Sequence, residues 1–118
     1  MTRMRMPGTR RPESPDVQGE MTEFAHRVLD AVDKIPWGRV MSYSDVAEYV
    51  GAGGARAVGT VMARWGSEVA WHRVLHNDGS CAEHKADYQL ALLRREGVPM
   101  RSRLRVDMAA ARWDGTSA

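Results

Sequence analysis

The sequence contains one cysteine, Cys81, and no long run of apolar residues. A single thiol excludes a disulfide within the chain and a zinc site built from several cysteines. The lack of a long apolar run excludes a transmembrane helix, which needs about 20 such residues. The arginines near the N-terminus precede no apolar stretch, so we expect no signal peptide. These absences predict a cytoplasmic location, with nucleoid association if the protein is bacterial, and no contact with a membrane.

The chain is also short, at 118 residues. That length makes one domain and leaves no room for a dinucleotide-binding domain beside a substrate domain. We therefore expect no cofactor. With a single cysteine we also expect no metal site, and we expect the protein to be a monomer. The 43% apolar and 27% charged residues are typical of a soluble globular protein.

The net charge of +2 hides an uneven distribution. Residues 1–16 carry four arginines and two acids, and residues 17–93 carry seven basic and ten acidic residues. Residues 94–118 carry six arginines and three acids, and five of these arginines lie between Arg94 and Arg105. Such a cluster can contact the phosphates of a nucleic acid. It is equally consistent with an ordinary solvated surface.

Residues 1–16 hold three of the five prolines and show no apolar periodicity. This composition is typical of a disordered segment. We expect a disordered basic tail over residues 1–16 and one folded domain over residues 17–118.

Helical periodicity begins at residue 21. Apolar residues recur at the i, i+3 and i+4 spacing of a helix with one buried face, at Met21, Phe24, Val28, Leu29, Val32 and Ile35. Thr22 can cap this helix at its start, and Pro36 ends it because proline has no N–H to donate. A short extended piece is expected over residues 39–41.

Two short helices joined by glycines follow. Ser42 and Asp45 have the spacing of a capping box, which predicts a helix that ends at Gly51. A turn over residues 52–54 leads to a second helix over residues 55–64. The pair is a candidate helix-turn-helix. The polar face of its second helix carries only small residues around Arg56, which suits close packing on a neighbouring helix or entry into a nucleic-acid groove.

The remainder alternates between strand and helix signals. The run after Trp71 looks like a strand and ends in a turn at residues 77–79. A last helix is expected over residues 87–96, with Gly97 after its end, then a short strand over residues 103–106. Trp113 is placed to clamp the C-terminal segment onto the domain. The sequence thus predicts a mainly α fold with a short β-hairpin and a winged-helix-like helix-turn-helix.

Several of these pieces occur together, in the same order, in one family. The chain resembles the DNA-binding, active-site domain of the O6-alkylguanine-DNA alkyltransferases over roughly residues 21–100. The motifs that carry the resemblance are Pro36-Trp37-Gly38-Arg39-Val40, Ser42-Tyr43-Ser44-Asp45-Val46-Ala47, Ala55-Arg56-Ala57-Val58-Gly59, Trp71-His72-Arg73-Val74 and Arg95-Glu96-Gly97.

The main departure from the family lies at Trp71. The alkyltransferases carry Pro-Cys-His-Arg here, and that cysteine accepts the alkyl group, whereas this chain has Ala70-Trp71-His72-Arg73. The replacement is similar to that in the alkyltransferase-like proteins. This resemblance implies a non-enzymatic sensor of O6-alkylguanine in double-stranded DNA, which flips the damaged base and passes the site to nucleotide excision repair proteins.

The chemistry of the residues agrees with a protein that transfers nothing. Removing an O6-alkyl group needs a soft nucleophile, normally a thiolate beside a histidine. Indole offers only an N–H donor. Cys81 lies ten residues beyond Trp71 and past a predicted turn, so we do not expect it to occupy the same place. An active alkyltransferase that uses Cys81 is the less favoured alternative, and a helix-turn-helix transcription regulator is the other.

The resemblance assigns roles to further residues. Arg56 matches the finger that fills the space left by the flipped base, and Tyr43 matches the residue that crowds the phosphate beside it. The implied DNA-binding set is Tyr43, Ser44, Gly54, Ala55, Arg56, Gly59 and Thr60. The implied lesion pocket is Trp71, Met62, Val74, His84 and Trp65, supported by His72, Arg73 and Glu96.

Two further departures bear on which lesions are accepted. His84 stands where the family's pocket rim often has tyrosine or arginine, and it is the weaker cation–π partner unless it is protonated. We therefore expect recognition to depend on pH. Arg64-Trp65 stands where the enzymes have an asparagine after the second helix.

Overall fold

The computed structural model describes residues 21–116 of the chain. The predicted tail over residues 1–16 lies outside the described residues. The elements in chain order are α1 (Glu23–Asp33), β1 (Met41–Ser42), α2 (Tyr43–Val50), α3 (Ala55–Trp65), the 3₁₀ turns η2 (Gly66–Glu68) and η3 (Trp71–Arg73), β2 (Val74–Leu75), η4 (Glu83–Lys85), α4 (Ala86–Arg95), β3 (Met100–Ser102), β4 (Arg105–Val106) and α5 (Met108–Ala111). The predicted mainly α fold is confirmed.

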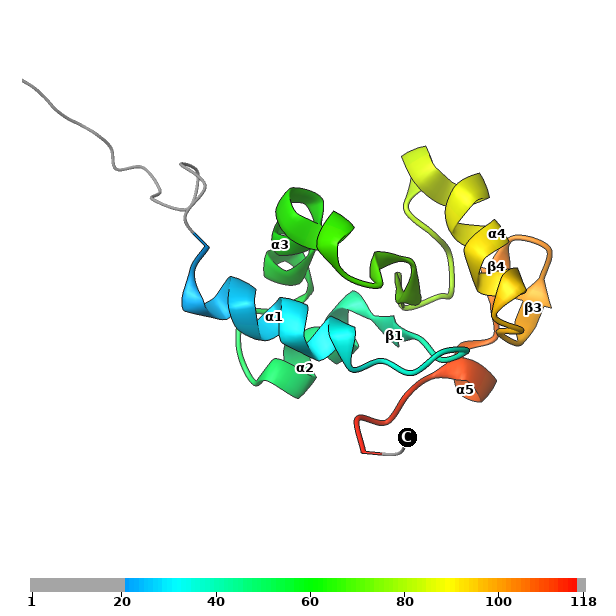
Figure 1. The fold of residues 1–118 in the computed structure, drawn as a ribbon. Helices are drawn as coiled ribbons and strands as arrows, with labels where there is room; N and C mark the ends of the chain where they lie inside the picture. Colours follow the sequence, from blue (N-terminus) through cyan, green and yellow to red (C-terminus); the bar gives the residue numbers. More distant parts are fainter. Residues whose placement is uncertain (1–20, 117–118) are drawn as a thin grey trace, which may run out of the picture.

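Two apolar clusters form the interior. Helices α1, α2 and α3 lie together on one side of the molecule, and α4, the β3–β4 hairpin and α5 lie on the other (Figure 1). The first cluster draws most of its residues from α1, α2 and α3, and the second includes residues of α4, β4 and α5. A two-stranded parallel sheet, β1 with β2, joins them. Met41 and Val74 belong to the first cluster, and the adjacent Val40 and Leu75 belong to the second. Because neighbouring strand residues point to opposite faces, one short sheet serves both clusters.

The residues predicted to begin and end the helices do so in the structure. The Thr22 hydroxyl accepts the Ala25 N–H at 3.1 Å at the start of α1. Ser42 and Asp45 form the predicted capping box. Gly51 ends α2 in the left-handed conformation, with a φ of +85°, which favours glycine. Helix α1 ends at Asp33, before the proline, since the residue preceding a proline avoids the helical conformation.

Near its C-terminal end the chain is fixed to the domain by Trp113, as predicted. Its side chain is buried in the first cluster, and its backbone N–H donates to the Val40 carbonyl at 2.8 Å. Its ring also lies against Tyr49.

The expected strand after Trp71 is largely wrong. Residues 71–73 form a 3₁₀ turn, and only Val74 and Leu75 are extended. His72 and Arg73 both contact Glu96, so their side chains do not alternate between the two faces of a strand. The hairpin of the fold is β3 with β4, in which Arg103 and Leu104 form the turn rather than strand.

Candidate nucleic-acid interface

The turn between α2 and α3 depends on glycine. Gly53 and Gly54 have φ angles of +87° and +120°, where L side chains are strained. A Cβ on Gly53 would lie 2.5 Å from the Phe24 ring of α1. The turn can therefore pack against α1 only without a side chain, which sets the angle at which α3 leaves α2.

One face of α3 is buried and the other is open. Val58 and Val61 enter the first apolar cluster, whereas Ala55, Arg56 and Thr60 are exposed. Among residues 21–116, no carboxylate lies within ion-pair distance of Arg56. The structure thus places the Arg56 cation beside the small exposed side chains of Ala55 and Thr60. Ser44 is exposed in the first turn of α2, and Gly54 precedes α3.

A cavity of about 260 Å³ lies between the C-terminal half of α3 and the segment around η4. This volume is slightly below the range of about 300–1,000 Å³ that is usual for sites of small molecules. The residues that line it are Tyr43, Gly59, Met62, Ala63, Gly66, Ser67, Trp71, Ala82, His84, Lys85 and Gln89. It therefore adjoins the open face of α3.

Of the five predicted pocket residues, Trp71, Met62 and His84 line this cavity. Two predictions are corrected. Val74 is 1% exposed inside the first apolar cluster, because β2 pairs with β1 there. Trp65 packs against the same cluster at the end of α3, with the Arg64 guanidinium over its ring, and is not part of the lining. Tyr43 and Gly59, predicted as DNA-binding, also line the cavity.

Six of the lining residues lie outside the predicted DNA-binding and pocket sets, and Gln89 is the most informative of them. Gln89 is 1% exposed, and its Nε2 donates to the carbonyls of His72 and Val74 at 3.1 and 2.9 Å. Its Oε1 accepts the Ala82 N–H. The sequence signal for Gln89 is a polar residue next to Leu90 on the buried face of α4, which indicates that its amide bonds groups inside the fold. The others are Ala63, Gly66, Ser67, Ala82 and Lys85.

Trp71 is surrounded by polar and aromatic groups. The Lys85 Nζ lies 4.9 Å from the centre of its ring, and the rings of Tyr88 and His72 lie 5.9 and 6.1 Å away. The indole is only partly buried. It is therefore held in place while one side remains open to the cavity.

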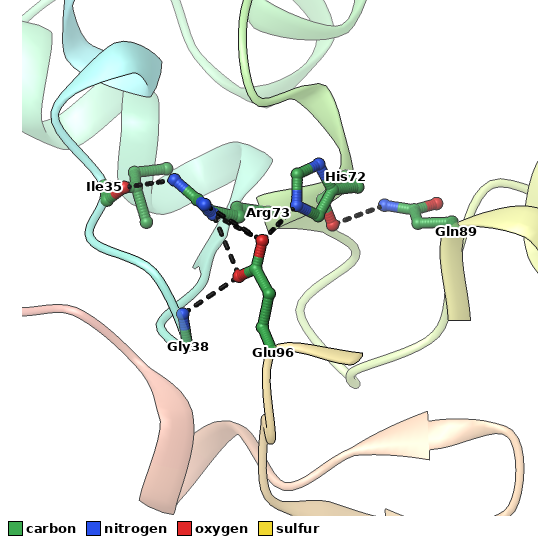
Figure 2. Close-up of polar contacts among 6 residues, drawn as sticks. All are labelled: Ile35, Gly38, His72, Arg73, Gln89 and Glu96. Carbon is green, nitrogen blue, oxygen red and sulfur yellow. Dashed lines mark hydrogen bonds and ion pairs between the residues drawn. The ribbon is translucent and has the colours of Figure 1, made fainter. Parts of the chain in front are cut away.

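Behind the cavity, Glu96 connects three segments (Figure 2). Its carboxylate accepts a hydrogen bond from His72 Nε2 at 2.6 Å, and Arg73 donates to both of its oxygens at about 3 Å. The Gly38 N–H donates to the same carboxylate at 2.9 Å, and Arg73 also donates to the Ile35 carbonyl. These bonds join α4, η3 and the loop after α1.

The protonation of Glu96 follows from these contacts. Burial alone would raise the pKa of this carboxyl, but the hydrogen bonds from Arg73, His72 and the Gly38 N–H outweigh burial and lower the pKa to about 2. Glu96 is therefore ionised at neutral pH and holds η3, which carries Trp71, against α4. The structure brings together the predicted support residues His72, Arg73 and Glu96.

Burial keeps two further groups neutral, one in the cavity lining and one outside it. Burial, and then the nearby Cys81, raise the pKa of the Tyr43 phenol. Burial raises the pKa of the Cys81 thiol to about 11. Cys81 packs against the second apolar cluster and is not part of the cavity lining. At neutral pH its sulfur is a thiol, which is a poor nucleophile.

Residues 21–116 contain no cluster of three or more histidine, cysteine or acidic side chains that could hold a metal ion. Within the same residues, no helix has the length and apolar character needed to cross a membrane.

Relatives with curated names share much of this chain. Alkyltransferase-like protein 1 of Schizosaccharomyces pombe is 42% identical over 66 residues, which cover 53% of this chain and 61% of the relative. The DNA base-flipping protein of Escherichia coli is 38% identical over 97 residues, which cover 77% of this chain and 74% of the relative. The chain thus spans less than two thirds of the first relative and about three quarters of the second.

Solved structures show the same fold. The crystal structure of S. pombe Atl1 in complex with damaged DNA containing O6-carboxymethylguanine matches with a TM-score of 0.68 and 32% identity, over 80% of this chain and 97% of that one. The crystal structure of Mycobacterium tuberculosis OGT in complex with DNA matches with a TM-score of 0.57 and 28% identity, over 89% of this chain and 58% of that one.

The family model described as "6-O-methylguanine DNA methyltransferase, DNA binding domain" matches residues 23–98. This segment holds α1 to α4, the cavity and the Glu96 contacts. The match covers more than half of the 118 residues, and it shows that the chain belongs to the 6-O-methylguanine DNA methyltransferase family through its DNA-binding domain.

Proposed function

We propose that this protein binds double-stranded DNA at O6-alkylguanine and flips the damaged base into the cavity without removing the alkyl group. The observation that carries the proposal is a cavity beside the open face of α3 whose wall includes an indole and no thiol. Relatives named for alkyltransferase-like and base-flipping activity, one of them solved with damaged DNA, support it.

In this proposal α3 docks in the minor groove. Apart from Arg56 and Arg64, its exposed side chains are small, so its backbone can come close to the DNA. Arg56 then enters the base stack. A planar guanidinium can stack on neighbouring bases and donate hydrogen bonds to the unpaired partner base. Tyr43 crowds the phosphate beside the target nucleotide and, as a neutral phenol, can donate a hydrogen bond to it.

The cavity then receives the flipped base. Extruding a base costs a few kcal/mol, and contact with an aromatic side chain recovers part of that cost. Trp71 supplies this contact, while Met62 and Gly59 supply apolar surface for the alkyl group. Damaged guanine pairs more weakly than guanine, so it flips at a lower cost and is bound preferentially.

We propose that no alkyl transfer follows. Displacement at the alkyl carbon requires a nucleophile aligned with it, and the position of the family's acceptor cysteine holds Trp71. Cys81 lies outside the lining, with a pKa of about 11 that keeps it protonated. The complex is therefore reversible, and the protein acts as a monomer that marks the lesion for nucleotide excision repair proteins.

A binding titration with matched duplexes tests this function. The duplexes carry either guanine or O6-methylguanine at one position within several flanking sequences. We expect tighter binding to the lesion in every sequence context. Equal binding to both bases would contradict the proposal, and a preference for one undamaged sequence over the lesion would favour a transcription regulator instead.

A further inference from the structure

Lys85 is one of only two lysines in the chain, and it lines the cavity. It lies in η4, and its ammonium group is 4.9 Å from the centre of the Trp71 ring. An ammonium group over an indole face is held by a cation–π attraction, which is weak at an exposed site. Lys85 is exposed, so its cation can exchange this contact for a stronger one at little cost.

The cavity lining contains no carboxylate. Among residues 21–116, no aspartate or glutamate lies within ion-pair distance of Lys85. The nearby Glu83 and Asp87 line a second hollow to which Lys85 also contributes, but neither carboxylate lies within ion-pair distance of its ammonium group. The cavity therefore carries one positive charge that the described part of the protein does not neutralise.

The polar groups that line the cavity differ in their capacity to bind a ligand. Gln89 uses its amide on backbone groups of Ala82, His72 and Val74, so it has little capacity left for a ligand. Gly59, Met62 and Ala63 of α3 supply small and apolar surface, and Lys85 comes from the segment on the opposite side. A ligand with an apolar body and an anionic substituent would match this arrangement.

We propose that Lys85 makes the cavity selective for O6 adducts that carry a carboxylate, such as O6-carboxymethylguanine. This inference rests on the proposed function, because the adduct must be flipped into the cavity. The carboxylate would replace the indole as the partner of the ammonium group, in a charge-assisted hydrogen bond. The flexible stem of lysine lets the charge follow the substituent. A neutral alkyl group gains nothing from this cation.

Four otherwise identical duplexes test the proposal. They carry guanine, O6-methylguanine, O6-carboxymethylguanine or its neutral amide analogue O6-carbamoylmethylguanine at one position. The last two have similar shapes and differ in charge. We expect the full chain to bind the carboxymethyl duplex about five- to tenfold more tightly than the carbamoylmethyl duplex, a ratio reduced by solvent screening at this exposed site.

Three variants isolate the lysine. Lys85→Gln should bring the ratio close to one, and Lys85→Arg should retain most of it. Lys34→Gln removes the same charge at the end of α1, outside the cavity lining, and should keep the full ratio. Chemical denaturation shows that each variant is folded, and the ratio of the two affinities is compared within each variant.

The outcomes separate the two proposals. Equal binding of the carboxymethyl and carbamoylmethyl duplexes by the parent, or an unchanged ratio in Lys85→Gln, would overturn the role of Lys85 and leave lesion binding intact. Failure to prefer any adduct over guanine would overturn the proposed function and this inference with it.

Discussion

Arg56 is the only charged side chain on the exposed face of α3 between residues 54 and 63. Among the described residues it has no ion pair, so the fold does not depend on its charge. We expect Arg56→Ala to weaken binding to an O6-methylguanine duplex by at least tenfold, because in the proposed function Arg56 fills the space left by the flipped base. The free energy of unfolding should change by less than about 0.5 kcal/mol.

The matched control for this change is Arg101→Ala, which removes the same charge from an exposed position in β3. It should weaken binding to lesion and undamaged duplexes by similar factors. Both factors should be smaller than the effect of Arg56→Ala on lesion binding. If Arg56→Ala also affects both duplexes equally, Arg56 contacts phosphate and does not act as the finger.

We expect the absence of a side chain at Gly59 of α3 to matter for lesion binding. Gly59 lies in the helix interior and lines the cavity, and a Cβ there would contact nothing within 4 Å. Gly59→Ala should stabilise the protein by about 0.5–1 kcal/mol, because alanine favours the helix. The same methyl group projects toward the cavity and the groove, so lesion binding should weaken about fivefold.

Chemical denaturation and duplex titration of Gly59→Ala together check this prediction. Because greater stability and weaker binding are expected from one variant, misfolding cannot explain the loss. Unchanged or tighter lesion binding would mean that α3 approaches the DNA less closely than proposed.

At the scale of elements, the Glu96 contacts hold η3 against α4 and make stability depend on pH. The pKa of Glu96 falls from 4.5 to about 2 in the folded protein. A lowered pKa means that this stabilisation is present above pH 4.5 and is lost as the pH falls from 4.5 toward 2. Urea unfolding at a series of pH values should therefore show the free energy of unfolding decreasing across this window.

Glu96→Gln tests the assignment. It should remove part of the decrease and cost about 3 kcal/mol at pH 7, because Arg73 loses its carboxylate partner. The exposed Glu48→Gln of α2 is the control and should keep the decrease. An identical pH profile in Glu96→Gln and the parent would show that another carboxyl group is responsible.

Local signals predicted these elements well, and long-range contacts were harder to predict. The capping box at Ser42, the glycine after α2 and the periodicity of α1 depend on neighbouring residues, so the sequence alone revealed them. The parallel pairing of Met41 with Val74 joins segments far apart in the chain and has no local signal. This pairing buries Val74, which the family resemblance alone predicts to line the pocket.

The same contrast holds for the site. The family motifs identified Trp71, His72, Arg73 and Glu96, and the structure brings these residues together. Lys85 and Gln89 are not parts of those motifs. Their positions follow from the way η4 and α4 fold over the cavity, which depends on tertiary packing.

For the whole molecule, the separation of charge along the chain predicts how affinity responds to salt. Arginines surround the β3–β4 hairpin, and base-reading side chains on α3 are few. Most of the affinity for undamaged DNA should therefore come from phosphate contacts. We expect the logarithm of the association constant to fall linearly with the logarithm of the salt concentration for both the lesion duplex and the undamaged duplex. The preference for the lesion should be retained. A lesion preference that disappears with salt would contradict specific recognition in the cavity.

The central claim, that the protein binds the damaged base and transfers nothing, is tested most directly by intact-mass analysis after incubation with an excess of O6-methylguanine duplex. The account predicts an unchanged protein mass, with O6-methylguanine still present in the recovered DNA. A stoichiometric gain of one methyl group on the protein, at Cys81 or elsewhere, with the DNA restored to guanine, would contradict it and make the protein an alkyltransferase.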